Sequence, residues 1–187
     1  MATTIAPPPR ASIPLKDGGE DGRPLPAGTR RIGMWLGLAA ISMMFIGLTS
    51  AYVASRGLGP AWEQVHLRPL IWIDTAVLLL SSYTIEQARR RRSARWLSVT
   101  WLLGLAFLAG QLTVFGQLAD EGLYLNTGRQ ASFYYVLTGL HGLHVLGGIL
   151  ALAWTTLRMR AATLEITSTY WRFMGVLWLY LLVVIFV

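Results

Sequence analysis

The sequence predicts an all-α, polytopic transmembrane helix bundle with five spans. Hydrophobic residues make up 54% of the 187 residues and charged residues only 13%, which is far from the composition of a soluble globular domain. Five stretches with few or no charges follow one another, and most reach the roughly 20 residues that a helix needs to cross a hydrocarbon core of about 30 Å. The chain has no cysteine, which excludes disulfides, thiolate catalysis and cysteine-held iron–sulfur clusters.

The chain divides into two parts. Residues 1–31 hold six of the eight prolines together with glycine pairs and mixed charges, which predicts a flexible cytoplasmic tail. Residues 32–187 are predicted to form one bundle, with spans over residues 33–54, 69–87, 96–118, 131–157 and 167–187.

Two polar residues within the predicted spans need partners. Asp74 makes the second span the weakest by hydropathy, and we expect it to be a hydrogen-bonded or interfacial carboxylate. Gln111 lies near mid-depth in the third span, where its amide needs a partner inside the protein. We therefore assign both residues to polar contacts between helices.

The fourth span carries two of the three histidines and has two different faces. Steps of about 100° per residue place Tyr134, Thr138, His141 and His144 within one arc, whereas Leu143 and Leu150 fall outside it. Polar groups are costly in hydrocarbon, so this arc is predicted to face protein or a cavity. Two roles stay open for it: a functional lipid or subunit contact, and hydrogen bonds that only join helices.

The histidines do not assemble into a convincing metal or haem site. His141 and His144 are close enough on one helix to share an ion, but His66 falls in a predicted loop at the membrane edge. The nearest carboxylates, Asp74 and Glu86, lie near opposite ends of the second span. We therefore expect no catalytic, cofactor-binding or metal-binding residue, and we expect the histidines to be satisfied by contacts between helices.

The basic residues predict the orientation. If the tail, the cluster at 89–95 and the segment 158–172 lie in the cytoplasm, only Arg56, Arg68 and Arg129 remain on the other side. This asymmetry predicts a cytoplasmic amino terminus and a periplasmic carboxyl terminus. It also explains the net charge of +7 without nucleic acid.

Four segments in order resemble subunit III of haem-copper cytochrome oxidases. SFYYVLTGLHGLHVLGG at 132–148 is similar to the signature helix of that family, and TYWRFMGVLWLYLLV at 169–183 is similar to its closing motif. The segments at 33–53 and 70–87 resemble the family's first two matching helices. The resemblance covers nearly everything but the tail and fits the short, five-helix bacterial form.

The resemblance implies a role as an accessory subunit. It implies a chain without haem or copper in the bacterial inner membrane, packed with subunits I and II of a cytochrome c oxidase of the aerobic respiratory chain. Those subunits hold the haem and copper, and cytochrome c donates electrons to the complex rather than to this chain. Phospholipid binding, assembly and sustained proton uptake and oxygen reduction are the expected contributions. Tyr170, Trp171 and Arg172 are expected at lipid headgroups on the cytoplasmic face, and Tyr134, Thr138, His141 and His144 at lipid or subunit contacts.

The sequence departs from the family pattern at four positions and leaves several alternatives open. Ile41 replaces a glutamate, Asp74 an asparagine, Arg172 a histidine and Gly175 an acid. The alternatives are the equivalent subunit of a quinol oxidase or nitric oxide reductase, a free-standing small transporter, and a haem-binding membrane cytochrome. The transporter is disfavoured because the sequence has no inverted repeat or broken helices. Haem type, bound lipid and membership of a respiratory supercomplex stay open.

Overall fold

The computed structural model describes residues 27–56, 69–125, 128–158 and 161–186, and the regular structure within these ranges is helical throughout. The helices are α1 (Ala27–Arg56), α2 (Pro69–Arg91), α3 (Ala94–Asp120), α4 (Arg129–Arg158) and α5 (Ala161–Phe186). Four of these helices, all except α2, are long and apolar enough to cross a membrane. The predicted all-α membrane bundle is therefore confirmed.

Helix α2 has low hydropathy because it contains several polar residues, and those in its first four turns point inward. Its 23 residues correspond to about 34 Å, which is enough to cross the hydrocarbon core. Asp74, Thr75, Ser81 and Thr84 are all buried. Before the arginines of the last turn, the exposed positions of the helix are apolar: Ala76 and the large residues Trp72, Ile73, Leu79, Leu80 and Tyr83. The fifth span stays a prediction, but α2 presents an apolar surface to its surroundings.

The helices extend beyond the predicted spans. Helix α1 begins at Ala27 instead of residue 33, and α5 begins at Ala161 instead of residue 167. The sequence-based bounds marked only the uncharged stretches, whereas the helical backbone continues through flanking charged residues such as Arg30 and Arg31. Most of the predicted tail, and the predicted loop with His66, lie outside the described residues.

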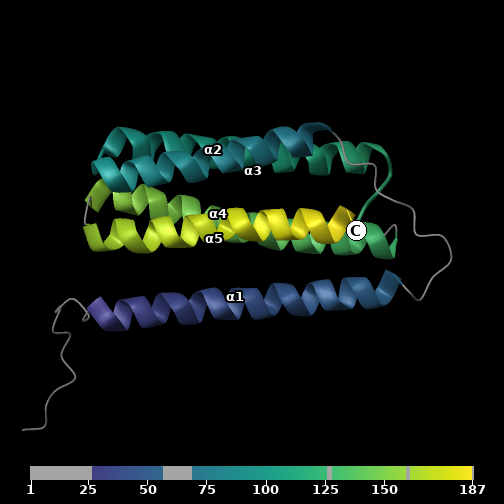
Figure 1. Cartoon of the computed structure of the whole chain (residues 1–187). Helices are drawn as coiled ribbons and strands as arrows, with labels where there is room; N and C mark the ends of the chain where they lie inside the picture. Colours follow the sequence, from purple (N-terminus) through teal and green to yellow (C-terminus); the bar gives the residue numbers. More distant parts are fainter. Residues whose placement is uncertain (1–26, 57–68, 126–127, 159–160, 187) are drawn as a thin grey trace, which may run out of the picture.

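The five helices lie side by side, with α1 at the periphery (Figure 1). Helices α2 and α3 form one closely packed pair, and α4 and α5 lie against them. One apolar cluster, which contains Phe107, Ile149 and Trp171, fills the space between α2, α3, α4 and α5. A second cluster, around Phe45 and Met174, joins α1 to α4 and α5.

Helix α3 ends in a turn that depends on glycine. Gly122 has φ +77°, a left-handed conformation that disfavours side chains with a Cβ. Its N–H donates to the Ala119 carbonyl at 2.9 Å, and the Leu123 N–H donates to the Leu118 carbonyl at 3.0 Å. This pattern is a Schellman cap, which satisfies the last carbonyls of the helix before the chain turns towards α4.

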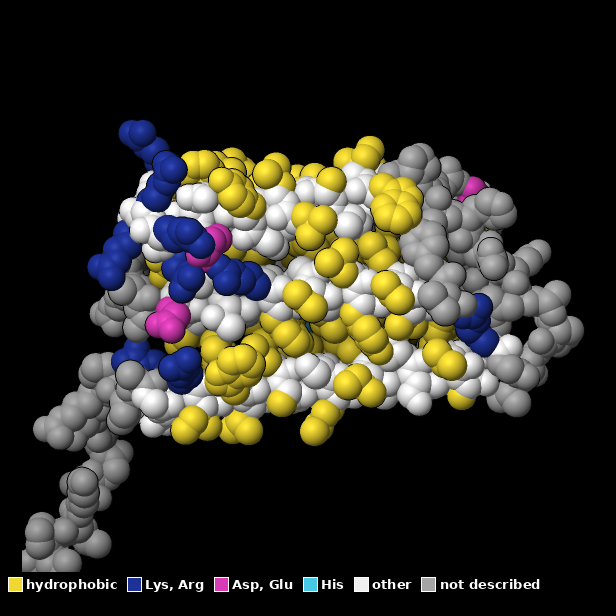
Figure 2. Space-filling model, viewed as in Figure 1, with side chains coloured by type: hydrophobic (Ala, Val, Ile, Leu, Met, Phe, Trp, Pro, Cys, Tyr) yellow, Lys and Arg dark blue, Asp and Glu magenta, His cyan; other side chains and the backbone are white. Residues whose placement is uncertain are grey.

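Arginines gather at one end of the bundle (Figure 2). This end includes the start of α1, the turn between α2 and α3, and the start of α5; Arg172 lies further along α5, towards its middle. The amino-terminal end of α1 and the carboxyl-terminal end of α5 lie at opposite ends of the bundle (Figure 1). The side of the membrane on which the arginines lie stays a prediction.

Candidate functional site

The polar arc of α4 faces the interior of the bundle. Tyr134, Thr138 and His141 are 4%, 1% and 0% exposed, whereas Leu143 and Leu150 are 62% and 64% exposed. The inward orientation predicted from the helical period is therefore confirmed. Because the three polar side chains are covered by this chain itself, the lipid or subunit contact predicted for them is not made directly.

His141 sits among aromatic rings from three helices. The ring centroids of Phe45 in α1, Phe107 in α3 and Trp178 in α5 lie 6.5, 6.0 and 5.2 Å from that of the imidazole. Neither ring nitrogen has a hydrogen-bond partner among the described residues. The contacts that this histidine makes with neighbouring helices are therefore aromatic, because those helices present ring faces and edges to it.

His144 lies one turn further along, where α1, α4 and α5 meet. Its Nδ1 is 2.7 Å from the Leu140 carbonyl oxygen, and its ring lies 5.9 Å from that of Phe45. The hydroxyl of Tyr170 donates to the His144 backbone carbonyl at 2.9 Å. Both side chains are partly exposed, so a lipid or subunit contact at His144 and Tyr170 stays a prediction.

Trp171 is a core residue and does not contact headgroups. It is 1% exposed, and its Nε1–H donates to Ser81 Oγ of α2 at 3.0 Å. The indole lies against two glycines: a Cβ added at Gly104 would come within 2.6 Å of its Cη2, and one at Gly148 within 3.1 Å of its Cε3. The headgroup contact predicted for Trp171 is wrong because this side chain fills the space between α2, α3 and α4.

A second indole, that of Trp178, also joins α5 to α2. Trp178 donates from Nε1 to Thr75 Oγ1 at 3.1 Å and is 1% exposed. Trp171 and Trp178 are seven residues apart and therefore lie on one face of α5. This pair of contacts was not predicted from the sequence, although the seven-residue spacing of the tryptophans indicates that they share a face of the helix.

Asp74 and Gln111 form a buried pair between α2 and α3. Gln111 Nε2 donates to Asp74 Oδ2 at 3.0 Å, and both residues are 3% exposed. Gly110 makes this approach possible, because a Cβ at that position would overlap the carboxylate of Asp74. The two residues that the sequence assigned separately to polar helix contacts therefore lie together.

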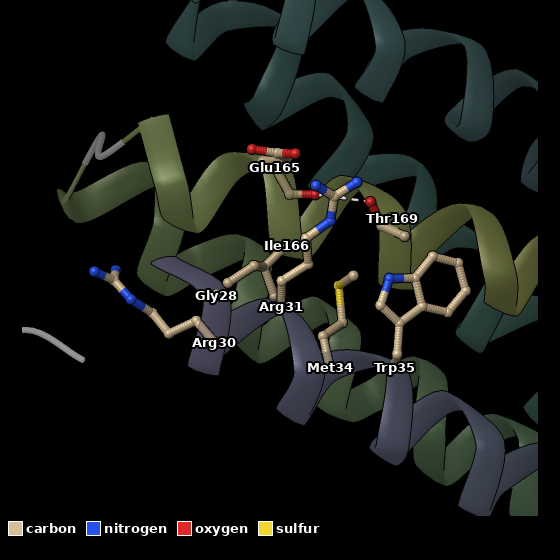
Figure 3. A pocket seen from close by; sticks show the side chains of 8 residues that line it. All are labelled: Gly28, Arg30, Arg31, Met34, Trp35, Glu165, Ile166 and Thr169. Atoms are coloured by element: carbon tan, nitrogen blue, oxygen red, sulfur yellow. Dashed lines mark hydrogen bonds between the residues drawn. The ribbon is translucent and has the colours of Figure 1, made fainter. Parts of the chain in front are cut away.

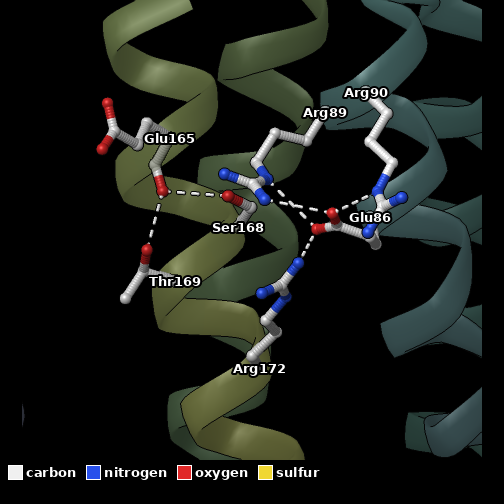
Figure 4. A network of polar contacts seen from close by, with 7 residues as sticks. All are labelled: Glu86, Arg89, Arg90, Glu165, Ser168, Thr169 and Arg172. Atoms are coloured by element: carbon white, nitrogen blue, oxygen red, sulfur yellow. Dashed lines mark hydrogen bonds and ion pairs between the residues drawn. The ribbon is translucent and has the colours of Figure 1, made fainter.

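Arg172 points towards α2 and forms an ion pair with Glu86 (Figure 4). Glu86 also accepts from Arg89 at 3.0 Å and from Arg90 at 2.6 Å, so one carboxylate faces three guanidinium groups. The Arg172 side chain remains 44% exposed, so the predicted headgroup contact stays a prediction. Among the described residues, no group of three or more histidines and carboxylates is placed to hold a metal ion.

A groove separates α1 from α4 and α5 at the arginine-rich end (Figure 3). We call it the α1 groove. It consists of two adjoining cavities of about 300 and 470 Å³ that share Arg30, Met34 and Ile166. The first is lined by Arg31, Trp35, Glu165 and Thr169 among others, and the second by Gly37, Leu38, Ile41, Gly147, Ala151 and Tyr170. The groove thus has a charged mouth and an apolar inner part.

Side-chain size explains why the α1 groove is open. Small residues on both helices line it, namely Gly37 on α1 and Gly147 and Ala151 on α4, and nothing lies within 4 Å of a Cβ built at Gly37. Ile41, which stands where the family pattern has a glutamate, lines the apolar part. This groove could not be predicted from the sequence, because a hollow between helices depends on how the helices are placed.

The comparisons with known proteins agree with the sequence pattern. A family model described as cytochrome c oxidase subunit III matches residues 19–187. The chain is 28% identical over 173 residues to the cytochrome c oxidase subunit 3 of Bacillus sp., and the match covers 83% of this chain and 84% of the relative. It is 32% identical over 179 residues to the cytochrome c oxidase subunit 3 of Synechocystis sp., with 84% and 75% covered.

A protein named for a different electron donor is also similar. The chain is 28% identical over 177 residues to the cytochrome bo(3) ubiquinol oxidase subunit 3 of Pseudomonas aeruginosa, with 85% of each chain covered. The family match spans every helix of the bundle.

Proposed function

Because the chain belongs to the cytochrome c oxidase subunit III family and is a subunit III of a haem-copper oxidase, we propose that it is the non-catalytic membrane scaffold of such a complex. In this role it stabilises subunits I and II in the bacterial inner membrane and sustains proton uptake and oxygen reduction there. Haem and copper, held by those partners, supply the redox chemistry. The observation that carries the proposal is the family match over residues 19–187.

The packing of the bundle supports a scaffold role. The indoles of Trp171 and Trp178 and the ring of Phe107 are at most 1% exposed and fill the interior between the helices. Two of these rings are fixed by hydrogen bonds to α2. A rigid, filled interior suits a structural subunit better than a solute pathway.

A quinol oxidase is the second candidate for the complex. The similarity to the Pseudomonas aeruginosa protein named as a ubiquinol oxidase subunit favours it. Since the electron donor binds to other subunits, the scaffold role of this chain is the same in both complexes. The proposed orientation, with the arginine-rich end in the cytoplasm, is also the same.

We assign the lipid-binding part of this role to the α1 groove. Arg30 and Arg31 lie at its mouth, where a lipid phosphate would approach; the Arg31 side chain extends towards α5, and the Arg30 side chain points outward, away from the cavity (Figure 3). Leu38 and Ile41 further inside form an apolar wall that suits an acyl chain. The direction from charge to apolar surface matches the expected direction from headgroup to hydrocarbon.

The test uses the oxidase complex carrying the double variant R30Q/R31Q. We expect loss of a co-purified phospholipid, detected by mass spectrometry of extracted lipids, and an earlier decline of oxygen consumption during turnover. The initial rate and the haem spectrum should be unchanged, because the groove is part of a subunit without redox chemistry. R95Q is the matched control, since Arg95 belongs to the same arginine-rich end but does not line the groove.

Two results would contradict the proposal. Full lipid content together with an unchanged lifetime in R30Q/R31Q would remove the α1 groove from the lipid role. A changed haem spectrum would show that this chain acts on the redox centres and is more than a scaffold.

A further inference from the structure

Asp74 is a carboxyl group enclosed by the helices, and none of its described neighbours is a cation. Its side chain accepts a hydrogen bond from Gln111 Nε2 at 3.0 Å, and its other oxygen lies against the backbone of α3 at Gly110. The ion pairs found among the described residues all involve Glu86, at the other end of α2. An ionised Asp74 would therefore rely on one neutral amide for its stabilisation.

The neighbouring helices present no charge to this carboxyl group. Helix α3 contributes Gln111 and Gly110, α4 contributes Tyr134, which lies within electrostatic range, and α5 contributes Trp178, which binds the adjacent Thr75. The three side chains, of Gln111, Tyr134 and Trp178, are neutral at neutral pH, and Gly110 contributes only backbone. An unpaired carboxylate in such surroundings costs several kcal/mol, and a carboxyl group in this situation usually keeps its proton instead.

One buried acceptor beside Asp74, the side-chain oxygen of Gln111, lacks a hydrogen-bond donor in the described part of the chain. Gln111 Oε1 is buried and has no donor among the described residues, although the Nε2 of the same amide is bonded to Asp74. Buried acceptors without a donor are rare in native proteins, and each requires an explanation. A protonated carboxyl group has one O–H donor, which an ionised one lacks.

We propose that Asp74 is a proton-binding site inside the bundle. Its carboxyl group carries a proton at neutral pH, accepts from Gln111 Nε2 and donates its O–H to Gln111 Oε1. The two side chains then form an acid–amide pair with two antiparallel hydrogen bonds, which satisfies both polar atoms of Gln111. No step of oxygen reduction is involved, so this site is additional to the scaffold role.

This pair is specific to the acid. An asparagine at position 74, as in the family pattern that the chain resembles, has an amide that also pairs with glutamine but binds no proton. The chain therefore holds a titratable proton between α2 and α3 where a relative with asparagine holds none. Gly110 keeps the pair tight, because the carboxyl group lies directly on its backbone.

The test measures the protonation state of Asp74 in the full-length chain in liposomes. Aspartate labelled with ¹³C at Cγ reports only four positions in this chain, and solid-state NMR distinguishes the protonated from the ionised carboxyl carbon. At neutral pH we expect one resonance at the protonated position, and we expect D74N to remove it. Asp120, exposed at the end of α3, is the reference position, and D120N identifies its resonance.

A Gln111→Met variant tests the pairing separately. We expect the Asp74 resonance to stay at the protonated position but to shift, because the amide partner is lost. The proton site would be overturned if the wild-type chain gave only ionised resonances. This measurement needs only the wild-type chain and D120N, so it can be made even if D74N does not accumulate. An unshifted or ionised Asp74 resonance in Q111M would overturn the acid–amide pair. Neither outcome affects the scaffold role, which the co-purified subunits test.

Discussion

Replacing Trp171 with alanine is expected to destabilise the folded bundle by about 3–5 kcal/mol. The indole is 1% exposed and occupies the space above Gly104 and Gly148, so the substitution leaves a cavity lined by three helices. It also removes the donor that Ser81 Oγ accepts from. Thermal unfolding of the full chain in a mild detergent, followed by circular dichroism, measures the loss.

Trp154→Ala is the control for this substitution. Trp154 is 55% exposed on α4, so the same change in residue volume occurs at the surface instead of in the core. We expect its midpoint to stay within a few degrees of wild type. Equal losses in the two variants would show that the interior does not depend on Trp171.

Gly110→Ala should separate α2 from α3, with a cost of about 1–3 kcal/mol. A methyl group at this position overlaps the carboxyl group of Asp74, whose hydrogen bond to Gln111 must then lengthen or break. The measurement is again the midpoint of thermal unfolding. A mild but distinct loss of oxidase assembly is expected in the membrane.

Gly116→Ala on the same helix provides a matched control. No atom lies within 4 Å of a Cβ built at Gly116, so the methyl group enters open space. Alanine has a higher helix propensity than glycine, which predicts a neutral or stabilising effect of up to about 1 kcal/mol. If G110A were as stable as G116A, the close contact at Asp74 would not exist in the folded protein.

Features that repeat along one helix could be predicted from the sequence. The inward face of α4 followed from the spacing of Tyr134, Thr138 and His141, because the period of an α-helix alone decides which side chains share a face. The need of Gln111 for an internal partner followed from the cost of an unsatisfied amide in hydrocarbon. Both predictions depend only on local geometry and on the solvent.

Features that depend on how helices meet could not be predicted in this way. Trp171 belongs to the motif for which the family resemblance implied contact with lipid headgroups. Gly104 and Gly148 instead leave a space in the core, and the indole of Trp171 fills it. The cage around His141 comes from three other helices, and the α1 groove is lined by residues of α1, α4 and α5, among them Gly37 and Gly147. The polar residues of α2 are explained in the same way, because its hydroxyl groups form hydrogen bonds with side chains of α3 and α5.

The central claim, that this chain is a scaffold of a haem-copper oxidase, is tested most directly by purification through a tag on the chain in a gentle detergent. Absorption spectroscopy, metal analysis and identification of the recovered subunits complete the measurement. The account predicts that subunits I and II are recovered with this chain, together with their haem and copper. A colourless chain recovered alone, or a haem band that stays with the separated chain, would contradict it.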